Sequence, residues 1–100
     1  MHYLVTYELA ADYLERRPQF RNVHLAHAWK AADEGHLLIG GALADPVDTA
    51  FIVFTGDSPA VAEEFARTDP YVTHGLVKRW SVRPWNTVAG PWCASPVRTV

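Results

Sequence analysis

The sequence predicts a single α+β domain in which two strand-helix-strand units share one antiparallel sheet. Short runs of β-branched and aromatic residues recur four times along the chain. Two segments with helical periodicity separate these runs. A length of 100 residues is enough for one ordinary domain and too short for two, and the composition, 49% hydrophobic and 20% charged, is globular.

The first unit begins with a strand at residues 3–7, which are β-branched and aromatic. Residues 9–18 are ambiguous and lead into a helix, where Pro18 suits the first turn. The main helix is predicted over residues 20–34, and Gly35 is its expected stop. At 3.6 residues per turn, the residues that share one face of this helix are Arg21, Leu25, Ala28, Trp29 and Ala32.

The second and third strands follow as a hairpin. Residues 37–39 open the second strand, which the pair Gly40–Gly41 is expected to interrupt and which closes near Leu43. Residues 45–48 form a turn, because Asp and Pro favour turns. The third strand covers residues 50–54 and is apolar at every position.

The second unit is completed by a shorter helix and a last strand. Ser58–Pro59 is a suitable N-cap and first turn for the helix. Val61 and Phe65 are predicted to form its inner stripe. The helix should end by Asp69, because the residue before a proline avoids the α region. The last strand is predicted over residues 76–82.

The order strand, helix, strand, strand, helix, strand defines the ferredoxin-like βαββαβ plait with a four-stranded antiparallel sheet. From Arg83 onward the chain is rich in Pro, Gly and Trp and shows no periodicity. We therefore assign residues 1–88 to the domain and residues 89–100 to a C-terminal tail.

The second and third strands are apolar on both faces, although the helices of a two-layer plait cover only one face of the sheet. Side chains such as Phe51 and Val53 would then form an apolar patch of a kind that monomers rarely expose. Each such side chain contributes about 1.5–3 kcal/mol when it is buried. A second copy of the chain is the natural cover, and the sequence therefore predicts a homodimer.

Charge and cysteine content narrow the function classes. Nine basic and eleven acidic residues give a formal net charge of −2, and the basic residues do not cluster, so no nucleic-acid partner is expected. The single cysteine, Cys93, excludes an intramolecular disulfide and fits a reducing compartment. The N-terminus has no leader pattern and no apolar run reaches the ~20 residues that span a bilayer, so we expect a cytoplasmic protein without a membrane partner.

Five histidines are many for this length, and two lie three residues apart in the predicted main helix. His24 lies at the edge of the inner face, where a neutral imidazole could accept or donate a proton near pH 7; the alternative is a structural histidine bonded to a backbone carbonyl. His27 is expected to turn further toward solvent. Together they could supply two metal ligands, but no third ligand is evident, so no metal site is predicted. His2 and His36 lie at element ends and are expected to be solvated.

The second candidate lies just after the shorter helix. Asp69 could orient an imidazole and stabilise its charged form, or it could be only the polar residue of the turn that Pro70 fixes. Tyr71 and Trp85 could line an aromatic substrate pocket, or they could belong to the core or to an interface. Gly40–Gly41 lacks the spacing of a phosphate-binding loop, so no cofactor is predicted.

Four segments resemble the YciI-like family in order and spacing: residues 21–25, 35–43, 69–71 and 83–86. The likeness covers about residues 1 to 88. The resemblance implies a ferredoxin-like plait that dimerises into an α+β barrel, which agrees with the apolar strands described above. One position departs from the family pattern, because many members have Pro where Gly41 stands.

The resemblance also implies roles for individual residues. His24 and Asp69 match the family's proposed acid/base pair, and Arg21 matches the basic position before the histidine. The implied function is a small cofactor-independent enzyme, of the lyase or isomerase kind, which acts on a small hydroxyaromatic or anionic substrate; dehydrohalogenation is one reaction represented in the family. In this hypothesis Arg21 holds an anionic group, and Tyr71 and Trp85 wall the pocket. The alternatives are a binding or sensor module that uses the same cleft without turnover, and a domain whose only role is dimerisation.

Overall fold

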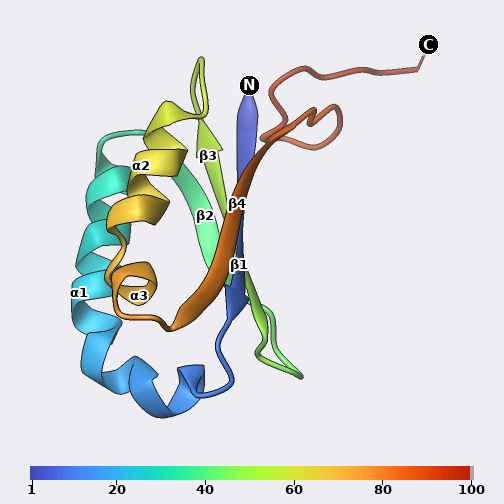
Figure 1. The fold of residues 1–100 in the computed structure, drawn as a ribbon. Helices are drawn as coiled ribbons and strands as arrows, with labels where there is room; N and C mark the ends of the chain where they lie inside the picture. Colours follow the sequence, from blue (N-terminus) through green and yellow to red (C-terminus); the bar gives the residue numbers. More distant parts are fainter. Residues whose placement is uncertain (100) are drawn as a thin grey trace.

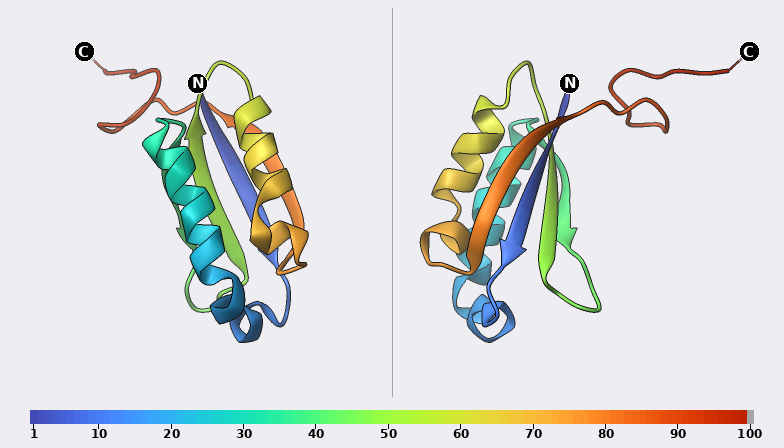
Figure 2. Two further views of the ribbon diagram at one scale, coloured as in Figure 1. Left: turned by 90° about the vertical axis from the view of Figure 1, so that its left-hand side faces the viewer. Right: turned by 45° about the vertical axis from the view of Figure 1, so that its right-hand side comes forward.

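The computed structural model describes residues 1–99 and has the predicted α+β architecture, with one open antiparallel sheet whose helices all lie on one face (Figures 1 and 2). The strand order is β2-β3-β1-β4, as in the ferredoxin-like plait. The elements in chain order are β1 (His2–Leu9), α1 (Tyr13–Asp33), β2 (Leu37–Ala42), β3 (Thr49–Thr55), α2 (Ala60–Thr68), α3 (Pro70–Thr73) and β4 (Val77–Trp85).

Helix α1 begins earlier than the sequence predicted. It starts at Tyr13 rather than near Phe20, and Pro18 therefore lies inside the helix and not in its first turn. A proline inside a helix removes one backbone hydrogen bond and bends the helix. Figure 1 shows that the first turns of α1 run at an angle to the rest. The earlier start adds about two turns at the N-terminal end of the helix, including Arg17.

Strand β2 was expected to break at Gly40–Gly41, but it runs through both glycines to Ala42. The irregularity lies instead between Leu37 and Ile39, where the register with β3 shifts. A Cβ on Gly40 would lie 3.3 Å from side-chain atoms of Ile52 on β3. The glycine therefore leaves room for the Ile52 side chain against β2.

The second half of the chain contains three departures from the prediction. Val61 was expected on the inner stripe of α2, but it is 43% exposed, and the buried residues are Ala62, Phe65 and Ala66. The short helix α3 was not predicted. Strand β4 continues to Trp85, although the chain from Arg83 had been assigned no regular structure. The longer β4 pairs with β1 along its whole length, from Leu9 to His2.

The core lies between the helices and the inner face of the sheet. On β3 the alternate residues Ala50, Ile52 and Phe54 are buried toward the helices. The outer face carries an apolar row, because Leu4, Val53 and Ile39 are paired across three neighbouring strands. Ile39 is 56% exposed in this row. The predicted apolar character of both faces of the sheet is therefore present in the structure.

The chain after β4 leaves the domain and projects beyond it (Figure 1). Thr87 links the start of this segment to β1, because its hydroxyl hydrogen-bonds to His2 Nδ1 at 2.8 Å. The same hydroxyl accepts a hydrogen bond from the backbone N–H of Ala94 at 2.8 Å. His2 was expected to be solvated, but it is only 7% exposed. Within residues 1–99, none of the helices has the length and apolar character needed to cross a membrane.

Candidate active site

The site is centred on Asp69, whose side chain is completely buried between α2 and α3. Its Oδ1 accepts the backbone N–H of Tyr71 at 3.0 Å, so the carboxylate caps the short helix α3. Its Oδ2 accepts a hydrogen bond of 2.7 Å from the hydroxyl of Tyr7, which reaches it from β1. A buried carboxylate is stable only when hydrogen bonds satisfy its oxygens, and these two donors help to fix its position.

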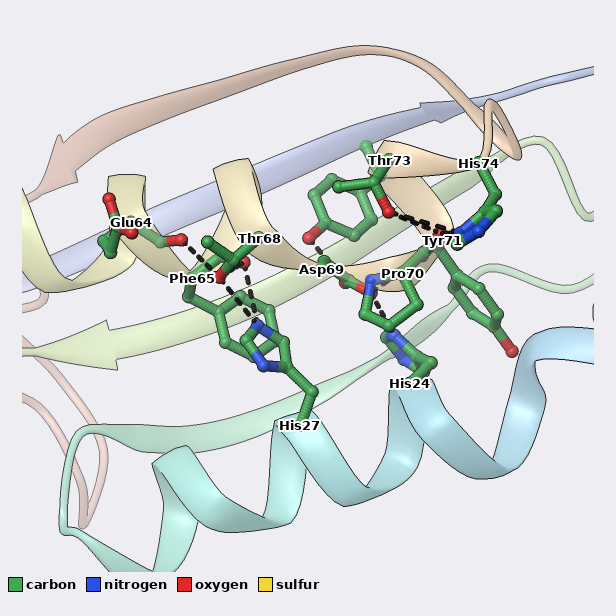
Figure 3. A network of polar contacts seen from close by, with 11 residues as sticks. His24, His27, Glu64, Phe65, Thr68, Asp69, Pro70, Tyr71, Thr73 and His74 are labelled. Atoms are coloured by element: carbon green, nitrogen blue, oxygen red, sulfur yellow. Dashed lines mark hydrogen bonds and ion pairs between the residues drawn. The ribbon is translucent and has the colours of Figure 1, made fainter.

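His24 meets Asp69 from α1, as Figure 3 shows. Its Nδ1 lies 2.8 Å from Asp69 Oδ1, and the pair is partly buried. An ionised carboxylate can only accept hydrogen bonds, so Nδ1 must carry a proton and donate it. In the neutral imidazole Nε2 is then the unprotonated nitrogen, the atom that can accept a proton from a bound molecule.

Tyr71 stacks on the His24 ring, with centroids 3.8 Å apart and the planes 7° from parallel. Its hydroxyl points away from Asp69, toward the N-terminal part of α1 (Figure 3). Burial, with a further contribution from nearby Tyr13, raises the pKa of Tyr71 to about 12, although Arg21 and Arg17 act in the opposite direction. Tyr71 is therefore a neutral hydrogen-bond donor at physiological pH.

A cavity of about 550 Å³ opens beside these residues, between α1 and strands β2 and β3. Its volume lies in the range of small-molecule sites. His24, Tyr71 and Tyr7 contribute to one side. The apolar lining comes from α1, β1, β2 and β3, with Leu9, Leu25, Ala28, Trp29, Leu37, Leu38, Ile39 and Ile52.

Two arginines of α1, Arg17 and Arg21, also line the cavity. The guanidinium of Arg17 lies over the Tyr13 ring, 5.8 Å from its centroid. Tyr13 in turn meets Tyr71 edge to face at 5.5 Å. The cavity thus has a cationic, aromatic part, a histidine with one free nitrogen, and an apolar wall.

Trp85 is the predicted site residue that does not belong to this cavity in its own chain. It lies at the end of β4, opposite His2 in the register, and is 46% exposed. The other four predicted site residues, His24, Asp69, Arg21 and Tyr71, are brought together. Asp69 itself does not line the cavity but lies behind His24.

His27 differs from the expectation that it faces solvent. Its Nε2 donates to the backbone carbonyl of Phe65 at 3.0 Å, and its ring stacks on Phe65 with centroids 4.4 Å apart. His24 and His27 thus bind different partners and do not converge on a common point. In residues 1–99 no three or more His, Cys, Asp or Glu side chains are grouped so that they could hold a metal ion.

Sequence reasoning missed three residues of the site, Tyr7, Tyr13 and Arg17. Tyr7 lies on the buried face of β1, a strand whose residues alternate between buried and less buried positions. A buried tyrosine hydroxyl needs a hydrogen-bond partner, and this requirement could have identified Tyr7 from the sequence. Arg17 is four residues before Arg21 and so shares its helix face. It was overlooked because the helix was expected to begin after it.

Comparison with known proteins agrees with this architecture. A family model described as the YCII-related domain matches residues 1–86. The chain belongs to the YCII-related family. Two curated relatives, each named Protein YciI, come from Escherichia coli O6:H1 and Shigella flexneri; each is 35% identical over 97 residues, and the match covers 88% of this chain and 99% of the relative.

A solved structure also shares the fold of this YCII-related chain. It is the 5-chloro-2-hydroxyhydroquinone dehydrochlorinase TftG from Burkholderia phenoliruptrix, in complex with 2,5-dihydroxybenzoquinone. The TM-score is 0.72 and the sequence identity 19%, with 87% of this chain and 95% of that chain covered. At this identity the likeness establishes the fold.

Proposed function

We propose that the cavity is the active site of a small cofactor-independent enzyme that performs acid/base chemistry of the lyase or isomerase kind. The observation that carries the proposal is the His24–Asp69 hydrogen bond of 2.8 Å at the edge of the 550 Å³ cavity. Asp69 fixes the tautomer of His24 and stabilises the imidazolium that forms when Nε2 accepts a proton. Asp69 is therefore a positioning residue, and His24 is the group that would touch the substrate.

The proposed step is a proton transfer with no change in the redox state of the protein. Nε2 of His24 accepts a proton from an O–H or acidic C–H group of the substrate. The electron pair left behind forms a new π bond. In an isomerisation the proton returns at another atom, and in an elimination the leaving group departs with its bonding pair while the proton passes to solvent.

We propose a small hydroxyaromatic or anionic compound as the substrate. The apolar lining, with Leu25 and Trp29 from α1 and Ile52 from β3, suits a ring, and Tyr71 can donate a hydrogen bond to an oxygen of that ring. The dehydrochlorinase that shares this fold is named for a chlorinated hydroquinone. Loss of HCl from such a compound combines the two steps described above: one hydroxyl proton moves to the ring carbon that bears chlorine, and chloride then departs with its bonding pair as a second hydroxyl proton is removed and a quinone forms.

The direct test is a turnover screen of the purified protein. It measures chloride release from 5-chloro-2-hydroxyhydroquinone, and deuterium uptake from D₂O at ring carbons for hydroxyquinones and enol acids without chlorine. A proton-transferring site should accelerate at least one of these reactions above the protein-free rate. Binding of these compounds without any acceleration would contradict the enzyme proposal and favour the binding or sensor module.

We further propose that the protein works as a homodimer. The apolar row Leu4, Val53 and Ile39 on the outer face of the sheet supports this, because the helices all lie on the other face and Ile39 is mostly exposed (Figure 2). Pairing of two sheets through these faces would form the dimeric α+β barrel. The assembly and the cytoplasmic location are both open to direct measurement.

A further inference from the structure

The two arginines of the cavity carry an inference beyond proton transfer. Arg17 and Arg21 are four residues apart on α1, so their side chains project from the same face of the helix. Among residues 1–99, neither guanidinium lies within ion-pair distance of a carboxylate. Like charges at this spacing destabilise a helix, so the pair is not explained by helix stability.

The neighbouring Arg16 shows what a satisfied arginine on this helix looks like. It pairs with Asp12 at 4.0 Å and donates to the backbone carbonyl of His74 at 2.7 Å. Arg16 does not line the cavity. On α1, the two arginines without an ion pair are therefore the two that line the cavity.

The surroundings of Arg17 and Arg21 suit a particular kind of ligand. The planar guanidinium binds two oxygen atoms that share a negative charge better than it binds a single neutral oxygen. Both arginines lie close enough to Tyr71 to act on the pKa of its hydroxyl, which they lower. The ring of Tyr71 is the one that stacks on His24. Beyond them the cavity is apolar, with Trp29 and Ile52 in its lining.

We propose that Arg17 and Arg21 form an anion subsite, and that the ligand is a planar ring bearing a delocalised oxyanion. Two sources share this chemistry, a ring carboxylate and an ionised hydroxyquinone. In either case the anion lies at the arginines, Tyr71 donates a hydrogen bond to it, and the ring extends along the apolar wall past His24. The inference rests on the proposed function for the site, but anion binding can be measured without turnover.

The test uses three probes of similar size: 4-hydroxybenzoate, the neutral 4-hydroxybenzamide, and 2,5-dihydroxybenzoquinone in its ionised form. Dissociation constants are measured by NMR titration at low and high salt. We expect at least one anion to bind about tenfold more tightly than the amide, with a preference that falls as salt rises. The anion that binds more tightly distinguishes the carboxylate from the ring oxyanion.

Variants assign the preference to the arginines. Arg17→Gln and Arg21→Gln should each weaken binding of the preferred anion by about tenfold, and Arg→Lys at the same positions should weaken it less. Arg16→Gln, which removes the same charge one residue away, should leave binding within about twofold. Thermal unfolding of each variant checks that the fold is retained.

The contrary results are equally clear. The inference is wrong if the amide binds as well as both anions, if neither anion binds at about 10 mM, or if Arg16→Gln has the same effect as the cavity variants. A cavity that binds anions through both arginines but transfers no proton would overturn the proposed function and leave this subsite in place. Turnover that does not change when both arginines are replaced would support the proposed function and overturn the anion subsite.

Discussion

Replacement of Tyr7 by Phe removes a single oxygen atom from the centre of the site. The Tyr7 hydroxyl donates to Asp69 Oδ2 at 2.7 Å, and both side chains are almost inaccessible to solvent. In the variant, Oδ2 loses this donor while the carboxylate stays buried. The ring of Tyr7 and its packing on the inner face of the sheet are kept.

The size of the effect follows from the charge on the acceptor. A hydrogen bond to an ionised group contributes about 1.5–3 kcal/mol to stability, because loss of one partner leaves the other group desolvated. We therefore expect Tyr7→Phe to lower the free energy of unfolding by about 1.5–3 kcal/mol. In a domain of 60–100 residues, each kcal/mol corresponds to about 4–8 °C in Tm.

Urea unfolding followed by tryptophan fluorescence measures this change. Tyr3→Phe is the matched control, because Tyr3 is also buried on β1 but its hydroxyl makes none of the hydrogen bonds found among residues 1–99. The control should change stability by less than about 0.5 kcal/mol. If Tyr7→Phe is equally mild, Asp69 does not depend on Tyr7 and this description of the site is incorrect.

Three further predictions concern pH, assembly and the tail. Burial, with Asp69 beside it, raises the pKa of Tyr7, so above pH 10 the unfolded chain releases a proton that the native state keeps. Tyr7 then lowers stability by up to about 1.4 kcal/mol per pH unit, and Tyr71, whose pKa is also raised, adds a slope of its own. In urea titrations at pH 10 to 11, Tyr7→Phe should remove the Tyr7 part of the slope and leave that of Tyr71. Sedimentation equilibrium should give twice the chain mass of 11.2 kDa, and Val53→Asp should give the monomer; a wild-type monomer would contradict the dimer. A chain ending at residue 88 should fold with a stability within about 1 kcal/mol of the full chain, and failure to fold would show that the tail belongs to the domain.

The order and type of the main elements could be predicted because local pattern and topology agree. The strands are rich in β-branched and aromatic residues, and Pro70 ends α2 where expected. The errors came from tertiary contacts that override local signals. Strand β4 passes Pro84 because that residue pairs with Tyr3 of β1, and a proline is tolerated on an edge strand.

The candidate site was predictable in part for a similar reason. The spacing of α1 indicated that His24 lies at the edge of its inner face, and the family resemblance pointed to Asp69. No local pattern could show that Tyr7, 62 residues away in the chain, donates a hydrogen bond to that carboxylate. Nor could a pattern place Trp85 outside the cavity, since this depends on the β1–β4 register.

The central claim is that the free nitrogen of His24 transfers a proton in the cavity. The most direct measurement compares kcat/KM of the wild type, His24→Gln and His27→Gln on whichever compound the turnover screen identifies. His27 is the matched control, because it lies on the same helix but donates to Phe65 and does not line the main cavity. Since a positioned acid or base contributes about 10²–10⁴-fold, His24→Gln should lose at least about a hundredfold while His27→Gln stays within about tenfold. Turnover by His24→Gln within about threefold of the wild type would contradict the claim.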